Sequence, residues 1–312
     1  MQIRCKDFLE TAEGLIFAVL VDGIEDDRFL CFLRYLRTGP SFRKIETEEA
    51  NRLVTMDFPQ YRLHSRQRDV DLHGVARDQI VGHYRPMQRL HEIISTASRD
   101  PIENNLVSVV KVLENSGLSP ARLGVTGSLL IGAQKAGSDI DLVVYDRDDF
   151  EQLREIVRQA IANKSLAALN ETQWAETYRR RGCSLSFDEY LWHEGRKYNK
   201  ASWSGTKIDF SLVSELADQD HRSYRKIKPA EITARVIDAR YAFDHPARYP
   251  VNHSDIHEII SFTPTFAGQA IAGETVIACG ILEESECGMR RLVVGSSREA
   301  PGETIKVVRS AV

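Results

Sequence analysis

The sequence predicts a mixed α/β (α+β) fold with an α+β N-terminal segment, a central core and a small β-rich C-terminal domain. Two β-rich runs, 15–21 and 29–35, are joined by an acidic turn and indicate a hairpin. Helical and strand patterns alternate between about 100 and 230. From about 232 onward, short β-rich runs are separated by glycines. We therefore expect three domains, at 1–98, 99–230 and 231–312.

Composition and length are those of an ordinary folded protein. The chain has 312 residues, of which 42% are hydrophobic and 28% charged, and this excludes wholesale disorder. The net charge of −4 means that any nucleic-acid surface must be local. Five cysteines without a Cys-x-x-Cys pair favour a reduced, cytoplasmic protein. The longest apolar run, 15–21, is too short for a membrane helix, and we expect neither a signal peptide nor a membrane partner.

The elements follow from local patterns. Apolar residues at helical spacing predict an amphipathic helix over 102–116, which Gly117 and Pro120 end. A second such helix is expected over 149–162, with Asp148 as its N-cap. Ser186 and Glu189 form a capping box that begins a further helix. A helical pattern also runs from about 77 to 98, interrupted by Pro86. Strands are expected at 123–126, 139–145 and 207–213.

Gly127 and Ser128 follow directly on the short strand at 123–126. Gly127 permits a tight turn and the close approach of another group. Ser128 would then begin a helical turn, where unpaired N–H groups and the helix dipole attract anions. We interpret the pair as a phosphate cradle. Alternatively, Gly127 and Ser128 form only a turn and a helix N-cap, with no role in binding phosphate.

Asp139 and Asp141 are two residues apart on a predicted strand, so both carboxylates point to one face. Such a pair repels itself unless a cation lies nearby, and oxygen ligands favour Mg²⁺. Asp209, between Ile208 and Phe210, offers a third carboxylate on another strand. Three carboxylates can hold two metal ions for phosphoryl chemistry. The alternatives for the third acid are Asp188, Glu189 and Glu194, and the first two aspartates can also be read as solvated strand-end residues.

This combination resembles the nucleotidyltransferase superfamily of the DNA polymerase β type. The signature of that family is Gly-Ser at a short helix, an acidic-apolar-acidic strand about ten residues later, and a third aspartate on a later strand. The matching positions are Gly127, Ser128, Asp139, Asp141 and Asp209, and the likeness covers roughly residues 100–215. More narrowly, the chain is similar to an uncharacterised, mostly archaeal group of predicted nucleotidyltransferases with a hairpin-bearing front segment and a β-rich tail.

The resemblance implies a polymerase β-like core with a short mixed sheet and a metal-dependent nucleotidyltransferase activity. Asp139 and Asp141 would bind two Mg²⁺ or Mn²⁺ ions, and Asp209 would bind the ion that activates the attacking hydroxyl. Gly127 and Ser128 would hold the β- and γ-phosphates of a nucleoside triphosphate, with ATP as the expected substrate. The hydroxyl would attack the α-phosphorus, and pyrophosphate would leave.

Basic residues cluster between the second helix and Asp209. Arg196 and Lys197 are the candidates for contact with the nucleotide, because cations bind phosphate oxygens. The alternative for each is a solvated helix face. Aromatic residues interleave with them and would stack on bases or pack in the core: Tyr190, Trp192, Tyr198 and Trp203.

The acceptor is expected to be an RNA 3′ end, such as that of a tRNA, with the β-rich tail as an RNA-binding barrel. The net negative charge favours instead a hydroxyl of a protein or a small molecule. Two other classes are considered. A glycosyltransferase would use Asp-Ile-Asp to hold Mn²⁺, but it needs neither Ser128 nor Asp209. A non-catalytic nucleotide- or RNA-binding module would have no need to keep all three aspartates.

Overall fold

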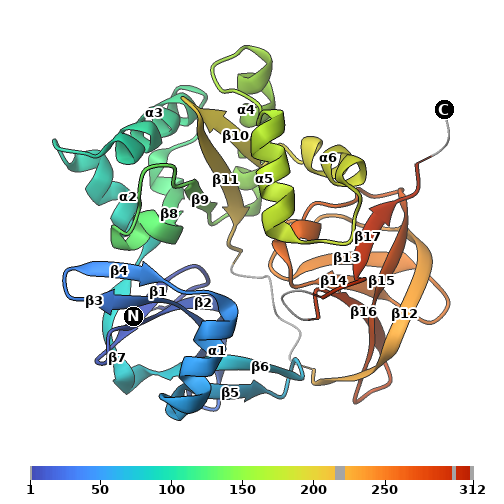
Figure 1. Cartoon of the computed structure of the whole chain (residues 1–312). Helices are drawn as coiled ribbons and strands as arrows, with labels where there is room; N and C mark the ends of the chain where they lie inside the picture. Colours follow the sequence, from blue (N-terminus) through green and yellow to red (C-terminus); the bar gives the residue numbers. More distant parts are fainter. Residues whose placement is uncertain (1, 215–221, 297–299, 310–312) are drawn as a thin grey trace. The chain divides into compact units, whose positions relative to one another are not determined.

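Two units make up the chain, and the computed structural model describes residues 2–214, 222–296 and 300–309 (Figure 1). The first unit comprises residues 1–167 and 201–215, and the second comprises residues 168–200 and 216–312. Each unit is therefore built from two separate stretches of the chain.

An antiparallel sheet forms the N-terminal part of the first unit, with strand order β5-β6-β3-β2-β1-β7. β4 pairs with the C-terminal end of β3, beyond the part of β3 that pairs with β6. The predicted hairpin is confirmed as β2 and β3. Helix α1 covers a core that includes Phe17, Leu33 and Tyr61. The elements are β1 (Phe8–Thr11), β2 (Leu15–Glu25), β3 (Arg28–Thr38), β4 (Ser41–Lys44), α1 (Thr47–Met56), η1 (Pro59–Tyr61), β5 (Arg62–Ser65), β6 (Val70–Ala76), η2 (Arg77–Gln79) and β7 (Ile80–Tyr84).

A four-stranded mixed sheet, in the order β10-β11-β9-β8, forms the predicted catalytic core. β9 pairs in parallel with β11 and antiparallel with β8. Helix α4 packs on β9 and β11, while α2 packs on β8. The elements are α2 (Pro86–Ser95), α3 (Pro101–Asn115), η3 (Pro120–Arg122), β8 (Leu123–Thr126), η4 (Gly127–Ile131), β9 (Ile140–Val144), α4 (Arg147–Ala162), β10 (Lys200–Trp203) and β11 (Thr206–Leu212).

The N-terminal sheet and this core are packed together within the first unit. Phe8, Ile16 and Tyr35 of the sheet share one hydrophobic cluster with Leu130 and Ile131 of η4. The N-terminal segment is thereby held against the turn that carries Gly127 and Ser128.

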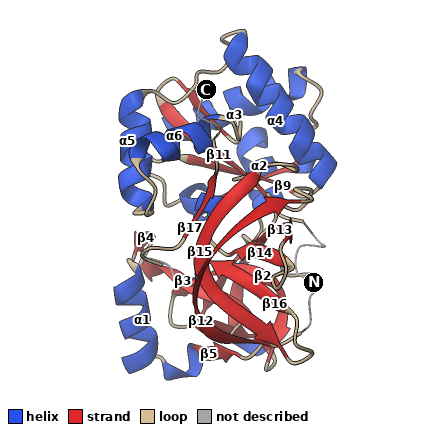
Figure 2. Ribbon diagram, turned by 90° about the vertical axis from the view of Figure 1, so that its right-hand side faces the viewer, coloured by secondary structure: helices blue, strands red, loops and turns tan. Residues whose placement is uncertain are grey.

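A small barrel dominates the second unit (Figure 2). β12 pairs with both β13 and β15, so the order β12-β13-β14-β16-β15 closes on itself, and β17 adds to β15. Leu185 and Tyr190, on or near α6, belong to the same core as Tyr249, Phe266 and Leu292. The elements are α5 (Glu171–Arg181), α6 (Phe187–Gly195), β12 (Tyr224–Val236), β13 (Ala247–Asn252), β14 (Glu258–Ser261), η5 (Pro264–Phe266), β15 (Thr275–Ser285), β16 (Arg290–Val294) and β17 (Thr304–Val307).

The predicted fold class is confirmed, including the short mixed sheet and the β-rich C-terminal region. Two local predictions are wrong. Residues 80–84 form strand β7, because they pair with β1, and the helix begins only at Pro86. Asp146 rather than Asp148 is the N-cap of α4, since its Oδ1 accepts the N–H groups of Asp148 and Asp149.

The three predicted domains stay a prediction. The sequence predicts residues 168–200 as part of the domain at 99–230, whereas they pack in the second unit. No helix among the described residues combines the length and the apolar character of a membrane span.

Candidate active site

Three predicted aspartates are brought together by the register of the four-stranded sheet. Asp141 of β9 is the register partner of Asp209 on β11 and of Thr126 on β8. Asp139 directly precedes β9 and lies two residues from Asp141, so the two share a face of the sheet. The carboxylates therefore gather beside the end of β8, where the Gly127-Ser128 turn begins.

Gly127 allows the Asp141 carboxylate to approach the turn. Its φ is +66°, and a Cβ at this position would lie 2.2 Å from Asp141 Oδ2. A side chain here would therefore force the Asp141 carboxylate to shift, and the positive φ also favours glycine. Ser128 follows in η4 and is half-exposed.

Lys207 supplies a cation between two of the acids. Its Nζ lies 2.9 Å from Asp139 Oδ2 and 3.4 Å from Asp209 Oδ2, and its side chain is only 7% exposed. In the sequence, Lys207 is one of the basic residues near Asp209, but Arg196 and Lys197 are the predicted phosphate contacts. The signal that finds Lys207 is the Lys-x-Asp spacing on β11, which places Lys207 and Asp209 on the same face.

The charges of the three acids act on one another. Burial, and then the nearby carboxylates of Asp209 and Asp139, raise the pKa of Asp141. The positive charges of Lys6 and Lys207 oppose that rise. A bound cation would lower the pKa of the Asp141 carboxyl and so favour its ionised form.

The donor set fits a hard divalent cation, because three carboxylates are the ligands that Mg²⁺ and Mn²⁺ prefer. The close approach that Gly127 permits leaves Asp141 beside the other two acids. In the described part of the chain, no group of three or more His, Cys, Asp and Glu side chains is already arranged around a metal position. In this structure the ammonium of Lys207 lies between Asp139 and Asp209.

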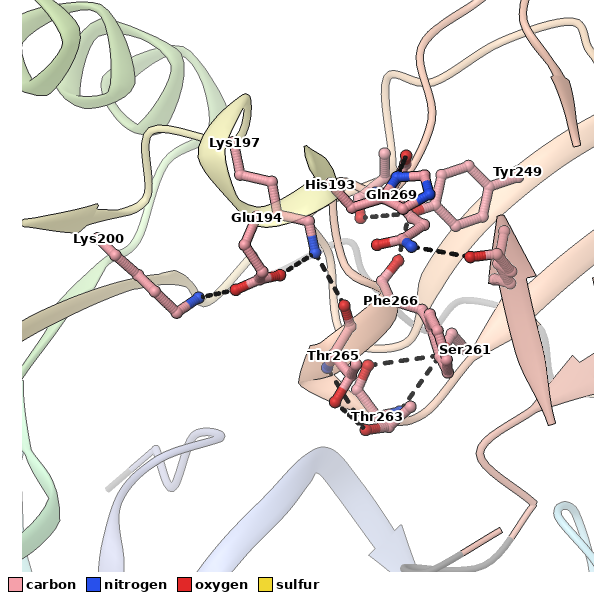
Figure 3. Close-up of polar contacts among 12 residues, drawn as sticks. His193, Glu194, Lys197, Lys200, Tyr249, Ser261, Thr263, Thr265, Phe266 and Gln269 are labelled. Atoms are coloured by element: carbon pink, nitrogen blue, oxygen red, sulfur yellow. Dashed lines mark hydrogen bonds and ion pairs between the residues drawn. The ribbon is translucent and has the colours of Figure 1, made fainter. Parts of the chain in front are cut away.

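Arg196 and Lys197 have partners in the second unit. Arg196 Nη1 donates to Glu274 Oε1 at 2.7 Å. The Lys197 ammonium is buried and donates to Glu194 and to the Thr265 carbonyl, the latter at 2.8 Å (Figure 3). Their role as phosphate ligands stays a prediction, and these contacts do not support it.

Glu194 lies in the same buried network, between Lys197 and Lys200 (Figure 3). Burial works to raise the pKa of Glu194, but the two ammonium groups outweigh it and lower the pKa to about 2. Burial in turn lowers the pKa of Lys197 to about 8. Two alternatives for the third acid thus have other roles. Glu194 is paired with Lys197 and Lys200, and Glu189 forms the capping box of α6 with Ser186. The register with Asp141 favours Asp209.

Two comparisons with known proteins give matches. The family model described as a nucleotidyltransferase domain matches residues 108–228, which include all five signature positions. The uncharacterised protein MJ1086 of Methanocaldococcus jannaschii is 32% identical over 340 aligned residues, which cover 99% of this chain and 100% of the archaeal protein. No solved structure matches the chain.

Proposed function

Because the chain belongs to the nucleotidyltransferase family and is an enzyme that transfers nucleotidyl groups, we propose a substrate, an acceptor and a set of site residues for it. It transfers a nucleoside monophosphate from a nucleoside triphosphate, ATP by preference, to the hydroxyl of an RNA 3′ end. A tRNA is the expected RNA, and pyrophosphate is released. The observation that carries the proposal is the register of Asp141 with Asp209 beside Gly127.

The roles of the residues follow from their chemistry. Asp139, Asp141 and Asp209 would hold two divalent ions, Mg²⁺ or Mn²⁺, which when bound would supply positive charge at the α-phosphate and favour ionisation of the attacking hydroxyl. Gly127 and Ser128 bind the β- and γ-phosphates. Asp209 takes the proton of the hydroxyl as its oxygen forms a bond to the α-phosphorus. The bond from that phosphorus to the bridging oxygen breaks, and pyrophosphate leaves.

The closed barrel supports RNA as the acceptor. Its strands are connected as a Greek key, and β14 and β16 form its one parallel pair among the described strands. Five-stranded Greek-key barrels of the OB type bind oligonucleotides. Because a fold does not by itself define a function, the acceptor needs a direct test. A cytoplasmic location belongs to the same proposal, since all five cysteines are free thiols.

The test is to incubate the protein with each α-labelled nucleoside triphosphate, Mg²⁺ or Mn²⁺, and a mixture of total RNA and lysate protein. We expect label in RNA with wild type and none with Asp141→Asn. Label in protein or in a small-molecule fraction would replace the RNA acceptor with the alternative one. Absence of both label and released pyrophosphate, with every nucleotide, would contradict the proposed reaction.

A further inference from the structure

The N-terminal segment makes a turn in which Lys6 has an unusual backbone conformation. The N–H of Asp7 donates to the carbonyl of Arg4 at 3.1 Å, so residues 4–7 form a four-residue turn. Lys6, the third residue of the turn, has φ +73°. Glycine or asparagine ordinarily occupies such a position. A lysine there is held at a conformational cost, which is a reason to look for a function of its side chain.

This turn lies against the candidate active site. The carbonyl of Lys6 accepts a hydrogen bond from Thr126 Oγ1 at 3.0 Å. Thr126 directly precedes Gly127 and is the register partner of Asp141. Beside Lys6, Cys5 is packed with Val143 of β9 and with Val213. The backbone of Lys6 is thus fixed next to both the turn and the acidic strand.

The Lys6 ammonium remains accessible to a ligand. Its charge acts on Asp141, since it opposes the rise in the pKa of that carboxyl. The residue is half-exposed, and among the described residues its ammonium has no hydrogen-bonding or ion-pair partner. The other lysine at the site, Lys207, is already held by Asp139 and Asp209.

We propose that Lys6 binds the phosphate groups of the nucleotide, so that the N-terminal segment completes the nucleotide site. This inference rests on the proposed function. It assigns a substrate-binding residue to a part of the chain that lies outside residues 108–228, where the family model matches. A lysine whose backbone is held beside Thr126 and the Gly127-Ser128 turn is suited to phosphate oxygens, which its ammonium binds as a point charge.

The test uses glycine substitutions at two lysines with the same backbone conformation. Lys6→Gly removes the side chain but suits the left-handed turn, so its unfolding temperature should equal or exceed that of wild type. Lys164→Gly is the matched control, because Lys164 has φ +65° and is exposed after α4. Calorimetry measures the binding of the Mg²⁺ complexes of ATP, GTP, CTP and UTP to each protein.

We expect Lys6→Gly to weaken the tightest of these nucleotides about tenfold, equivalent to about 1.4 kcal/mol. Lys164→Gly should bind it as wild type does, and Lys6→Arg should retain most of the affinity. Binding of Mn²⁺ without nucleotide should be equal or tighter in Lys6→Gly, since a positive charge beside the carboxylates has gone.

Two results would overturn the inference in different ways. If wild type and Lys6→Gly bind nucleotide equally, Lys6 only balances the carboxylates, and the proposed function stands. If wild type binds none of the four nucleotides, the proposed function fails and Lys6 loses its role with it.

Discussion

A Cβ atom on Gly127 would lie 2.2 Å from Oδ2 of Asp141. This contact links the two halves of the signature, because the turn that is proposed to hold phosphate also limits where the acidic strand can place its carboxylate. Gly132, five residues later in the same segment, has a similar φ of +69°, but a Cβ there would meet nothing within 4 Å. The two glycines therefore separate the effect of the contact from that of the backbone conformation.

Gly127→Ala should reduce nucleotidyl transfer at least a hundredfold, because the added methyl group displaces the Asp141 carboxylate. Gly132→Ala should cost about 1 kcal/mol of stability, as expected for an alanine at positive φ, and keep most of the activity. Turnover and thermal unfolding measured on both variants check this. Equal activity losses would mean that only the backbone conformation matters.

Asp139→Asn and Asp141→Asn should each lower transfer by several orders of magnitude while the fold survives. Each loses one negative ligand and hence both ion binding and charge stabilisation. Asp148→Asn, at an exposed position in the first turn of α4, is the control and should remain active. The measurement is turnover at saturating Mg²⁺ together with circular dichroism. Full activity in either site variant would show that the substituted aspartate is not needed for the reaction.

Lys207→Met should make the stability of the protein depend on divalent ions. Without the ammonium between Asp139 and Asp209, the acids repel one another, and we expect a loss on the order of 2 kcal/mol in EDTA. Adding Mg²⁺ should raise the unfolding temperature of this variant more than that of wild type, since an ion that binds the folded state stabilises it. Lys111→Met, at an exposed position on α3, should behave as wild type. An equal response to Mg²⁺ in all three proteins would argue against ion binding by these acids.

His73 should make the first unit sensitive to acid. The Leu33 N–H donates to His73 Nδ1 at 2.9 Å, so Nδ1 acts as an acceptor and carries no proton. The proton of the neutral ring is then on Nε2, which lies 3.1 Å from Asn51 Oδ1. Burial lowers the pKa of His73 from 6.5 to about 4. Between these values the unfolded chain binds a proton that the folded chain does not. The free energy of unfolding therefore falls as the pH decreases through this window, by up to about 1.4 kcal/mol per pH unit.

The check is the unfolding midpoint of the first unit between pH 7 and 4.5, in wild type and His73→Gln. The glutamine does not titrate, so the slope of the midpoint against pH should become shallower, whatever the absolute stability of the variant. An unchanged slope in His73→Gln would show that other groups control the acid sensitivity.

The sequence predicted the catalytic core well because its signals are local. Short strands, the Gly-Ser turn and the aspartate spacing are each contained in a few residues, and β8, η4, β9 and β11 appear where expected. Strand β7 could not be predicted in this way. Its residues also suit a helix, and pairing of Tyr84 with Phe8, far away in the sequence, decides the outcome.

The surroundings of the aspartates were harder to predict than the aspartates themselves. The position of Lys207 follows from strand periodicity once β11 is known. That of Lys6 depends on the packing of the N-terminal sheet against η4, which no local pattern contains. The cluster of basic residues around Arg196 predicts a phosphate contact, and only the folded structure reveals Glu274 as its partner.

The interleaving of the two units along the chain also sets the order in which they can be completed during synthesis. The first unit ends at residue 215, so all of its strands have left the ribosome while the barrel is still being translated. Helices α5 and α6, made earlier, must wait for β12 to β17 before Leu185 and Tyr190 are covered. A ribosome that stalls once the first unit has emerged would therefore carry a chain with all three aspartates in a complete unit and with two helices whose apolar side chains are still uncovered, which chaperones recognise.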